Sequence, residues 1–347
     1  MAGQSPEPST VTLADVARRA RVSPATASRV INGSAKRVTG ELKERVLKAV
    51  SDLRYVPNAH AQHLARSQRS AVGVIVHDVS DPYFAEITRG LQRVATDGGR
   101  LLVICNSYGE PDRELAYVEL LRAQQVHALV LAGSGYHDAA FTKKINGQLE
   151  AYVRSGGRVS VIGRHDHVGS AVLPDNEHGG FLATSRLYEL GHTVVGVVAG
   201  PKLLTTTTDR LAGVRRAARD RGQGVPPPRV VHADFSRDGG ADATRQLLDG
   251  CPGLTAILAL NDSMAVGALS VLRANRIRVP EDISLIGFDD MPIAVDVTPA
   301  LTTVRLPLIE MGTRAMTLAL DDEDPEGRRE TIEVSLVWRE SCAAIPA

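Results

Sequence analysis

The chain lacks the features by which enzymes and metalloproteins are usually identified in a sequence. Its three cysteines, Cys105, Cys251 and Cys342, lie far apart, and neither they nor the ten scattered histidines have metal-site spacing. There is no Walker sequence, and the first apolar run ends in His77-Asp78 instead of a glycine-rich turn. No nucleophile–base arrangement is recognisable. The sequence therefore predicts no metal, no cofactor and no enzymatic activity.

Long apolar runs are also missing. Residues 1–10 are polar and contain two prolines, unlike a signal peptide, and no run approaches the ~20 residues of a membrane-spanning helix. We therefore expect a cytoplasmic protein with no membrane partner. The length of 347 residues exceeds what one hydrophobic core fills, since cores stop growing near ~250–300 residues. More than one domain is expected.

The net charge is zero, but the charge is unevenly distributed along the chain. Residues 1–70 contain twelve Lys and Arg against five Asp and Glu, a net charge of +7, which leaves −7 on the remainder. A basic segment on an acidic body is typical of a protein whose amino-terminal part binds a polyanion. Charge alone leaves open a solvated basic surface with no partner.

Two short helices joined by a tight turn are predicted within residues 12–33. Thr12 is a suitable N-cap for the first helix, and Ser23 followed by Pro24 marks the start of the second. Apolar residues at helical spacing close a small core. The outward face of the second helix is then left with Ala25, Thr26, Ser28, Arg29 and Asn32. Because such a helix fits the major groove, the pattern predicts a helix-turn-helix that reads DNA.

A third helix is expected from Thr39 to about Leu53, where the Val56-Pro57 step that follows interrupts helical geometry. Residues 58–65 could form one or two further helical turns, with Leu64 as their single large apolar side chain. Such a short helix is unstable alone in water, so it would order only against a partner surface.

From residue 71 onward, short apolar runs alternate with amphipathic helices, which predicts an α/β fold with parallel sheets covered on both faces. A last strand is expected at residues 331–337. Eight earlier runs fall into two sets of four and indicate two similar lobes: 72–76, 101–105, 128–131 and 159–162, then 194–199, 230–231, 256–260 and 283–288.

Several segments resemble the LacI/GalR family of bacterial transcription regulators. Residues 12–33, Tyr55-Val56-Pro57-Asn58 and Leu64-Ala65 are similar to the family's headpiece and hinge. Further family motifs follow in family order, up to the end of the chain: Gly73-Val74-Ile75-Val76, Asp81-Pro82-Tyr83-Phe84, Asp175-Asn176, Gly179-Gly180, Gly191-His192, Asn261-Asp262-Ser263-Met264, Val279-Pro280-Glu281-Asp282, Gly287-Phe288-Asp289-Asp290 and Pro299-Ala300-Leu301-Thr302.

The resemblance implies an all-α headpiece at 10–57, a hinge helix and linker at 58–69, and a two-lobed core at 70–347 like periplasmic sugar-binding proteins. It places the lobes at about 70–167 with 300–330, and 168–299 with 331–347. No leucine heptads follow Trp338, so a homodimer is expected, and a two-fold dimer predicts a near-palindromic double-stranded operator.

Base reading is expected from the start of the second helix. Arg29 is the best candidate for a bidentate contact to guanine, worth ~1–3 kcal/mol of discrimination. In the family's hinge, Leu64 would enter the minor groove and kink the duplex, although packing on the core is an alternative. For Thr12 and Ser23, simple helix capping is the alternative role. The full set of predicted DNA contacts is Thr12, Leu13, Ser23, Pro24, Ala25, Thr26, Ser28, Arg29, Asn32, Tyr55, Asn58, Ala61 and Leu64.

A small-molecule effector is expected between the lobes, at the carboxyl ends of the strands. The candidate contacts are Asp81, Tyr83, Phe84, Ser134 and Arg164 from one lobe, and Thr206, Arg210, Phe235, Asn261 and Asp289 from the other. Carboxylate and guanidinium groups can each hold two sugar hydroxyls. The alternatives are a helix cap for Asp81, a helix-surface arginine for Arg210, a core ring for Phe235 and a turn for Asp289. The threonine run 205–208 is interpreted as helix capping with partial exposure, with a polar rim for a ligand as the alternative.

These features favour a transcriptional regulator, expected to be a repressor, that is controlled by a small molecule, most often a sugar in this family. A sugar-binding protein without DNA activity and a nucleobase-responsive regulator are the alternatives. A steep loss of DNA affinity between ~50 and 200 mM salt would separate the regulator from the plain binding protein.

Overall fold

The computed structural model describes residues 11–31, 38–55, 71–166, 168–222, 224, 229–321 and 327–345. The chain divides into two compact units, residues 1–69 and 70–347. Four of the predicted DNA contacts lie outside the described residues: Asn32, Asn58, Ala61 and Leu64.

The amino-terminal unit contains α1 (Leu13–Ala20), α2 (Pro24–Ile31) and α3 (Gly40–Asp52), as the sequence predicts. Local chemistry sets their ends. Thr12 and Asp15 form a reciprocal capping box at the start of α1, in which the Thr12 hydroxyl donates to Asp15 at 2.7 Å. The Ser23 hydroxyl accepts the Thr26 N–H at 3.1 Å, so it caps α2.

The three helices share a small apolar core. It is made of short side chains, which lets the helices approach closely: Val16, Ala17, Ala20, Ala27, Val30, Val46 and Ala49. The Arg45 guanidinium on α3 donates to the carbonyls of Ala20 and Arg21, at 2.6 and 3.1 Å. This arginine therefore fixes α3 to the turn that separates α1 from α2.

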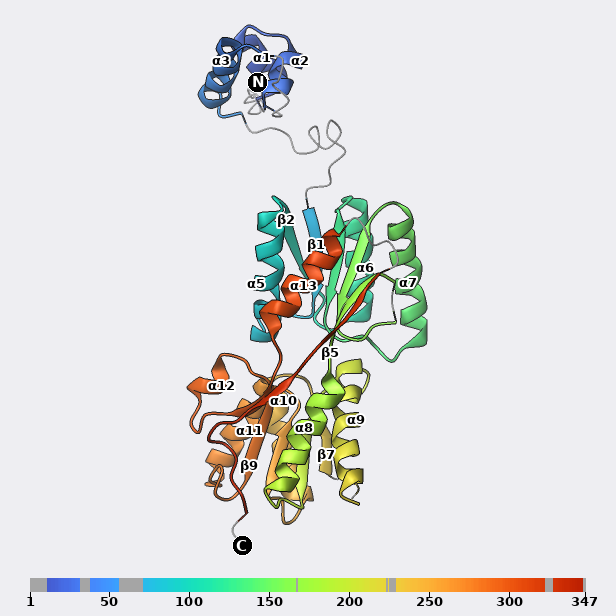
Figure 1. The fold of residues 1–347 in the computed structure, drawn as a ribbon, viewed down its shortest axis with the longest axis vertical. Helices are drawn as coiled ribbons and strands as arrows, with labels where there is room; N and C mark the ends of the chain where they lie inside the picture. The colour runs from blue at the N-terminus through green and yellow to red at the C-terminus, as the bar shows by residue number, and fades with distance from the viewer. Residues whose placement is uncertain are drawn as a thin grey trace, which may run out of the picture. The chain divides into compact units, whose positions relative to one another are not determined.

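The first lobe of the second unit is built on a six-stranded sheet with the order β11-β5-β4-β3-β1-β2, all parallel. Its strands are β1 (Ala71–Val76), β2 (Leu101–Asn106), β3 (Ala128–Ala132), β4 (Arg158–Ile162), β5 (Ser170–Pro174) and β11 (Arg329–Ile332). Figure 1 shows α5 (Pro82–Asp97) and α13 (Leu308–Leu320) on one face and α6 (Pro111–Ala123) and α7 (Ala139–Arg154) on the other.

The second lobe repeats this plan with the order β12-β10-β9-β8-β6-β7. Its strands are β6 (Val195–Ala199), β7 (Val230–His232), β8 (Ala256–Ala259), β9 (Ser284–Asp289), β10 (Thr302–Arg305) and the antiparallel β12 (Ser335–Val337). The helices are α8 (Asn176–Glu189), α9 (Thr205–Asp220), α10 (Arg237–Gly250), α11 (Asp262–Ala274) and the short α12 (Ile293–Asp296).

Pairs of glycines allow the covering helices to pack backbone against backbone. A Cβ atom on Gly90 of α5 would collide with the Ile309 carbonyl on α13, and one on Gly312 of α13 would collide with the Ile87 carbonyl on α5. The same reciprocal arrangement joins α8 to α9 and α10 to α11. These close contacts fix the helix that carries Arg210, which becomes important at the site below.

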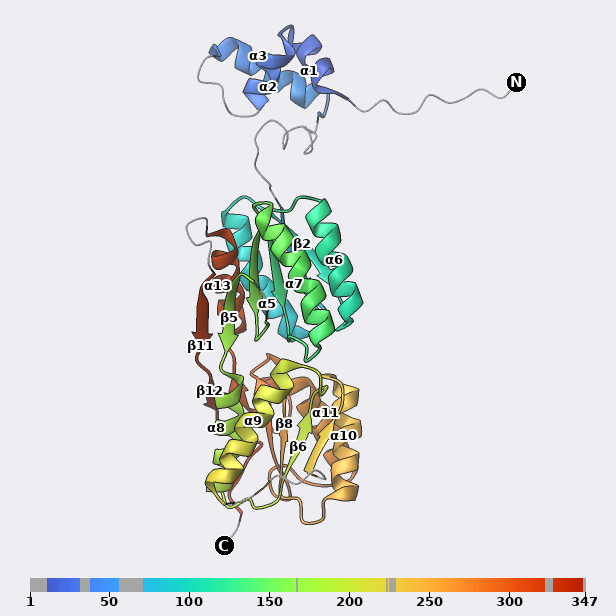
Figure 2. The ribbon, with the colours of Figure 1, turned by 90° about the vertical axis from the view of Figure 1, so that its right-hand side faces the viewer.

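The chain passes between the lobes three times: after β5, after β10 and between β11 and β12. The boundaries expected at 168, 300 and 331 therefore need correction, since β5 and β11 belong to the first sheet and β10 belongs to the second. The single strand expected at 331–337 is also wrong: it is two strands, β11 and β12, which follow one another along the edges of the two sheets (Figure 2).

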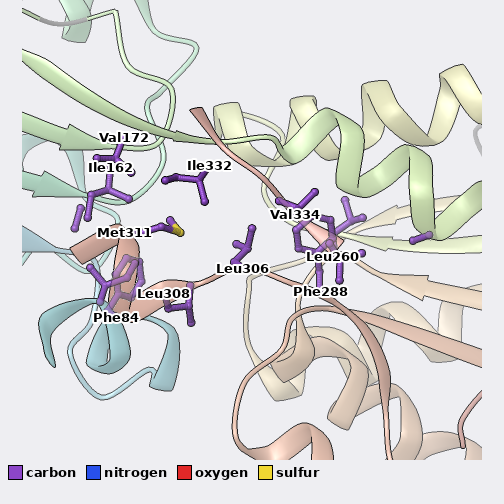
Figure 3. Packing of buried hydrophobic residues seen from close by; sticks show 14 of the residues in the cluster. Phe84, Ile162, Val172, Leu260, Phe288, Leu306, Leu308, Met311, Ile332 and Val334 are labelled. Carbon is purple, nitrogen blue, oxygen red and sulfur yellow. The ribbon is translucent and has the colours of Figure 1, made fainter. Parts of the chain in front are cut away.

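The apolar core continues through the crossovers. Figure 3 shows Leu306 between Met311 of the first lobe and Phe288 of the second, with Ile332 and Val334 on a neighbouring crossover. All five side chains are buried. The lobes are thus joined by packed apolar side chains as well as by the backbone.

Among the described residues, no helix is both long and apolar enough to span a bilayer. The same residues hold no group of three or more His, Cys, Asp or Glu that could bind a metal ion.

Candidate functional site

A cavity of about 620 Å³ lies between the two lobes of the core. It is bounded by the segments that follow β1, β2 and β3 on one side and β6, β7, β8 and β9 on the other, the carboxyl ends of the strands. Eight of the ten predicted effector contacts line it: Asp81, Tyr83, Phe84, Ser134, Arg210, Phe235, Asn261 and Asp289.

Arg210 is the most highly bonded of these side chains. It is 2% exposed, and its guanidinium donates to the Asn176 amide oxygen at 2.9 Å, to the Leu260 carbonyl, and to the Asp289 carboxylate at 2.8 Å. The guanidinium carbon also lies 3.7 Å from the centre of the Phe288 ring. This arginine is therefore not a helix-surface residue: its position is fixed by three elements of the second lobe.

Asp289 ends β9 with a backbone φ of 107°, a conformation that side-chain-bearing residues rarely adopt. Burial raises the pKa of its carboxyl to about 7, while the charge and hydrogen bond of Arg210 oppose the shift. Burial also raises the pKa of the neighbouring Asp262, which bonds Thr303 at 2.6 Å and the Met291 N–H at 2.7 Å. A strained backbone at a carboxylate that faces a cavity is more typical of a binding residue than of a simple turn.

Asp81 and Asn261 combine a structural role with a place in the cavity wall. The Asp81 carboxylate accepts the Tyr83 N–H at 3.0 Å at the start of α5, and the Asn261 amide oxygen accepts the Met264 N–H at 2.8 Å at the start of α11. Burial raises the pKa of Asp81. Capping fixes both side chains where they face the cavity, so the two roles hold together.

The first lobe contributes rings to the cavity wall. Tyr83 and Phe84 meet edge to face with centroids 5.0 Å apart, His77 lies 5.5 Å from Phe84, and Tyr136 lies 6.1 Å from His77. Burial lowers the pKa of His77 to about 4, so this ring is neutral. We call the continuous surface of Tyr83, Phe84, His77 and Tyr136 the ring wall.

Arg164 and Thr206, both predicted effector contacts, do not line the cavity. The Arg164 guanidinium binds the Asp209 carboxylate across the lobes at 2.9 and 2.7 Å, and Thr206 accepts the Ser134 hydroxyl at 2.7 Å. A backbone bridge between Tyr136 and Leu204 lies beside them. These contacts, which we call the latch, satisfy both side chains within the protein and hold one side of the cleft together.

The capping interpretation of the threonine run is also wrong. Helix α9 begins at Thr205, and its N-cap residue, Leu204, makes no side-chain cap. Instead, the Thr205 hydroxyl donates to the Arg164 carbonyl at 2.9 Å, and Thr208 bonds His137 at 2.9 Å. The threonines bind the opposite lobe, which sequence patterns within one lobe do not reveal.

Sequence reasoning missed several cavity residues, above all Tyr108 and Tyr136. Both follow strands of the first sheet directly, and Tyr108 has a positive φ of 54° fixed by its N–H bond to the His77 carbonyl at 2.7 Å. The rule that ligands bind at the carboxyl ends of strands would have identified them.

A larger cavity, of about 660 Å³, lies elsewhere in the core, around Asp290, Arg305 and Arg339. Its three carboxylates are already paired: Arg305 and Arg339 each donate to Asp290 at 2.6 Å, Arg89 donates to Glu86 at 2.8 Å, and Arg314 donates to Glu310 at 3.0 Å. The cavity at the strand ends has the greater ring surface and lies where ligands bind in open α/β sheets, so it is the candidate effector site.

In the headpiece, Ser23, Pro24, Ala25 and Arg29 are exposed on or beside α2, while Thr26 and Ser28 are half-buried. Leu13 and Tyr55 pack against the small core. Thr12 caps α1 and is exposed, and Ser23 caps α2, so the capping roles of both residues are confirmed.

Comparisons with known proteins agree with this architecture. Residues 12–58 match the model of the bacterial regulatory proteins of the lacI family, and residues 184–342 match a periplasmic binding protein-like domain. The chain is 36% identical over 311 residues to the HTH-type transcriptional regulator GalR of Escherichia coli, covering 89% of this chain and 88% of that protein.

Two solved structures extend the comparison. The Lac repressor dimer bound to operator and the anti-inducer ONPF superposes with a TM-score of 0.83 at 27% identity, covering 97% of this chain and 100% of that one. The transcriptional regulator CelR–cellobiose complex gives a TM-score of 0.71 at 31% identity, covering 95% and 99%. The chain belongs to the lacI family of bacterial regulatory proteins and is a DNA-binding transcriptional regulator.

Proposed function

We propose that the protein is a repressor that binds a near-palindromic operator as a homodimer and is controlled by a carbohydrate bound between the lobes of its core. The observation that carries this proposal is the pairing of a capped helix-turn-helix with a separate ligand cavity in one chain. The proposed parts are a headpiece at 10–57, a hinge at 58–69 and an effector core at 70–347. Its place of action is then the cytoplasm, where the DNA is.

The headpiece is proposed to read DNA through the exposed start of α2. Arg29 supplies the donors for a guanine edge, and the exposed Thr12 and Ser23 lie at helix N-termini, where backbone N–H groups attract phosphate. Asn58, Ala61 and Leu64 are proposed from the sequence alone as minor-groove contacts of the hinge.

The test is a selection of genomic fragments by the purified full-length protein, followed by titration of the selected site and its single-base variants. Arg29→Ala is expected to weaken binding to the preferred site by ~1–3 kcal/mol and to relax the preference at one base pair of each half-site. Arg19→Ala is the matched control, because Arg19 on α1 pairs with Asp52 at 3.3 Å. It should leave the preference unchanged.

An Arg29→Ala protein that still discriminates between the base variants would overturn the assignment of that residue. Sedimentation as four chains would contradict the homodimer. The carbohydrate is supported by the carboxylates and guanidinium of the cavity and by the cellobiose complex of CelR. A metabolite screen in which no compound changes operator affinity would contradict effector control.

A further inference from the structure

We propose that the effector is an uncharged disaccharide, with one ring held at the Arg210–Asp289 end of the cavity and the second placed along the ring wall. This inference rests on the proposed function, since it specifies the ligand of the same site. Three independent properties of the cavity carry it: its volume, its charge and the distribution of its aromatic side chains.

The volume leaves room for more than one sugar ring. Pockets of ~300–1,000 Å³ are typical for drug-sized ligands, which are much larger than a hexose. At about 620 Å³, the cavity falls in the middle of that range. One hexose at Asp289 would leave the exposed rim, which Tyr108 and Leu203 line, filled only by water. A two-ring ligand also reaches the rim and displaces that water.

The charge of the lining argues against phosphorylated sugars and nucleotides. Among the residues that the structure describes, four carboxylates line the cavity, at Asp78, Asp81, Asp234 and Asp289, against a single guanidinium, that of Arg210. Arg210 is already bonded to Asp289 and two other groups, and His77 is neutral because burial lowers its pKa to about 4. An anionic group would therefore meet net negative charge without a free cation. Carboxylates instead accept hydrogen bonds from hydroxyl groups.

The aromatic side chains argue for more than one stacked ring. The protein has seven tyrosines, five phenylalanines and one tryptophan, and five of these thirteen residues line this cavity. The ring wall extends from Tyr83, whose hydroxyl is within electrostatic range of Asp289, to Tyr136, which forms a bridge to the second lobe. Tyr108 and Phe235 add rings from β2 and β7. Such a surface presents apolar faces over more than the length of one sugar.

Tyr108 is the residue best suited to distinguish the two rings. It is 56% exposed, lies outside the Arg210–Asp289 network, and lines the cavity with the Arg113 guanidinium 5.4 Å from the centre of its ring. It is thus placed to contact the second ring only. Its loss should not disturb folding, because an exposed side chain contributes little to the core.

The experiment is calorimetric titration of the full-length protein with matched sugars: glucose, galactose, cellobiose, maltose, lactose, glucose 6-phosphate and adenosine. We expect at least one disaccharide to bind ten times more tightly, or better, than its constituent monosaccharides, with no detectable binding of the phosphate. Tyr108→Ala should weaken disaccharide binding at least fivefold and leave monosaccharide binding unchanged.

Trp338→Ala is the control for loss of an exposed ring elsewhere on the core, since Trp338 stacks with Arg186 away from the cavity. It should change neither affinity. Equal affinity for the monosaccharide and the disaccharide, tighter binding of glucose 6-phosphate or adenosine, or an equal effect of Tyr108→Ala on both sugars would each overturn the inference. Those results leave effector control intact, whereas a protein whose operator affinity responds to no metabolite overturns the proposed function itself.

Discussion

The two lobes of the core share one strand order but bring different chemistry to the cleft between them. The second lobe presents a buried polar network centred on Arg210 and Asp289, whose hydrogen bonds reach Asn176 and Leu260. The first lobe presents the ring wall, and Asp81 is its carboxylate nearest to Asp289. Similar topology therefore does not imply similar roles, because the loops after the strands determine what each lobe contributes.

The difference means that the second lobe orients the ligand, whereas the first lobe supplies apolar contact area. Arg210 and Asp289 are fixed before any ligand binds, so they can orient hydroxyl groups without ordering further side chains. The ring wall supplies apolar surface, which is tolerant of the exact ligand. A change in the second lobe should therefore affect folding and binding together, whereas a change at the rim of the first lobe should affect binding alone.

The largest expected effect is that of Asp289→Ala. Removing this carboxylate leaves the guanidinium of Arg210 buried with its charge unpaired, which costs ~3–5 kcal/mol in comparable buried pairs. We expect a matching fall in the free energy of unfolding, measured with urea, together with complete loss of effector binding. Tyr108→Ala is the comparison variant from the first lobe, with an unchanged unfolding midpoint. Equal stability of the two variants would contradict the claim that changes in the second lobe affect folding while changes at the rim of the first lobe do not.

The first lobe holds its own buried acid beneath the ring wall. Burial raises the pKa of Glu114 on α6 to about 7, although a hydrogen bond with Tyr136 opposes the shift. His77, Ser107 and His165 lie close around Glu114. Glu114 is protonated in the folded protein between pH ~4.5 and 7, whereas in the unfolded chain it releases its proton, so its contribution to stability falls as the pH rises through this range.

Glu114→Gln tests this acid. The variant should gain stability relative to the parent as the pH rises from 5 to 8, approaching ~3 kcal/mol, since each pKa unit corresponds to about 1.4 kcal/mol. The difference between the two proteins is the quantity to measure, because His77, whose pKa is lowered, contributes a rise over nearly the same range. A stability difference that stays constant with pH would contradict the raised pKa.

Local signals in the sequence were enough to predict the headpiece. Thr12, Ser23 and Pro24 mark the helix ends by chemistry within three residues, and the structure begins α1 and α2 at the predicted positions. The apolar runs likewise identified β1 to β4 and β6 to β9. Strands β5 and β10 were not predicted, and the expected lobe boundaries placed their residues in the wrong lobe. Their place in a sheet depends on pairing with strands far away in the chain, which no local pattern records.

The site residues show the same contrast between positions set by local signals and positions set by distant contacts. Asp81, Asn261 and Asp289 were predictable because each follows a strand and precedes a helix or turn. Arg164 follows β4, and Thr206 lies in the first turn of α9. Both bind partners on the opposite lobe, and nothing in the sequence indicates which polar groups meet across a cleft. The latch is therefore visible only in the folded molecule.

The smallest expected effect is at the latch, the place where the two lobes bond directly. Arg164 and Asp209 are partly exposed, so Arg164→Ala should change the unfolding free energy by less than ~1 kcal/mol. It should nevertheless shift the lobes toward an open arrangement, because the bidentate pair favours the closed one, and so weaken effector binding a few-fold. Small-angle scattering should show a larger radius of gyration for the isolated core.

Arg216→Ala, which removes the Arg216–Glu177 pair within the second lobe, should leave both the radius and the affinity unchanged. If Arg164→Ala behaved like Arg216→Ala, the latch would be a surface ion pair without influence on closure, and the lobes would be coupled only through their apolar crossovers.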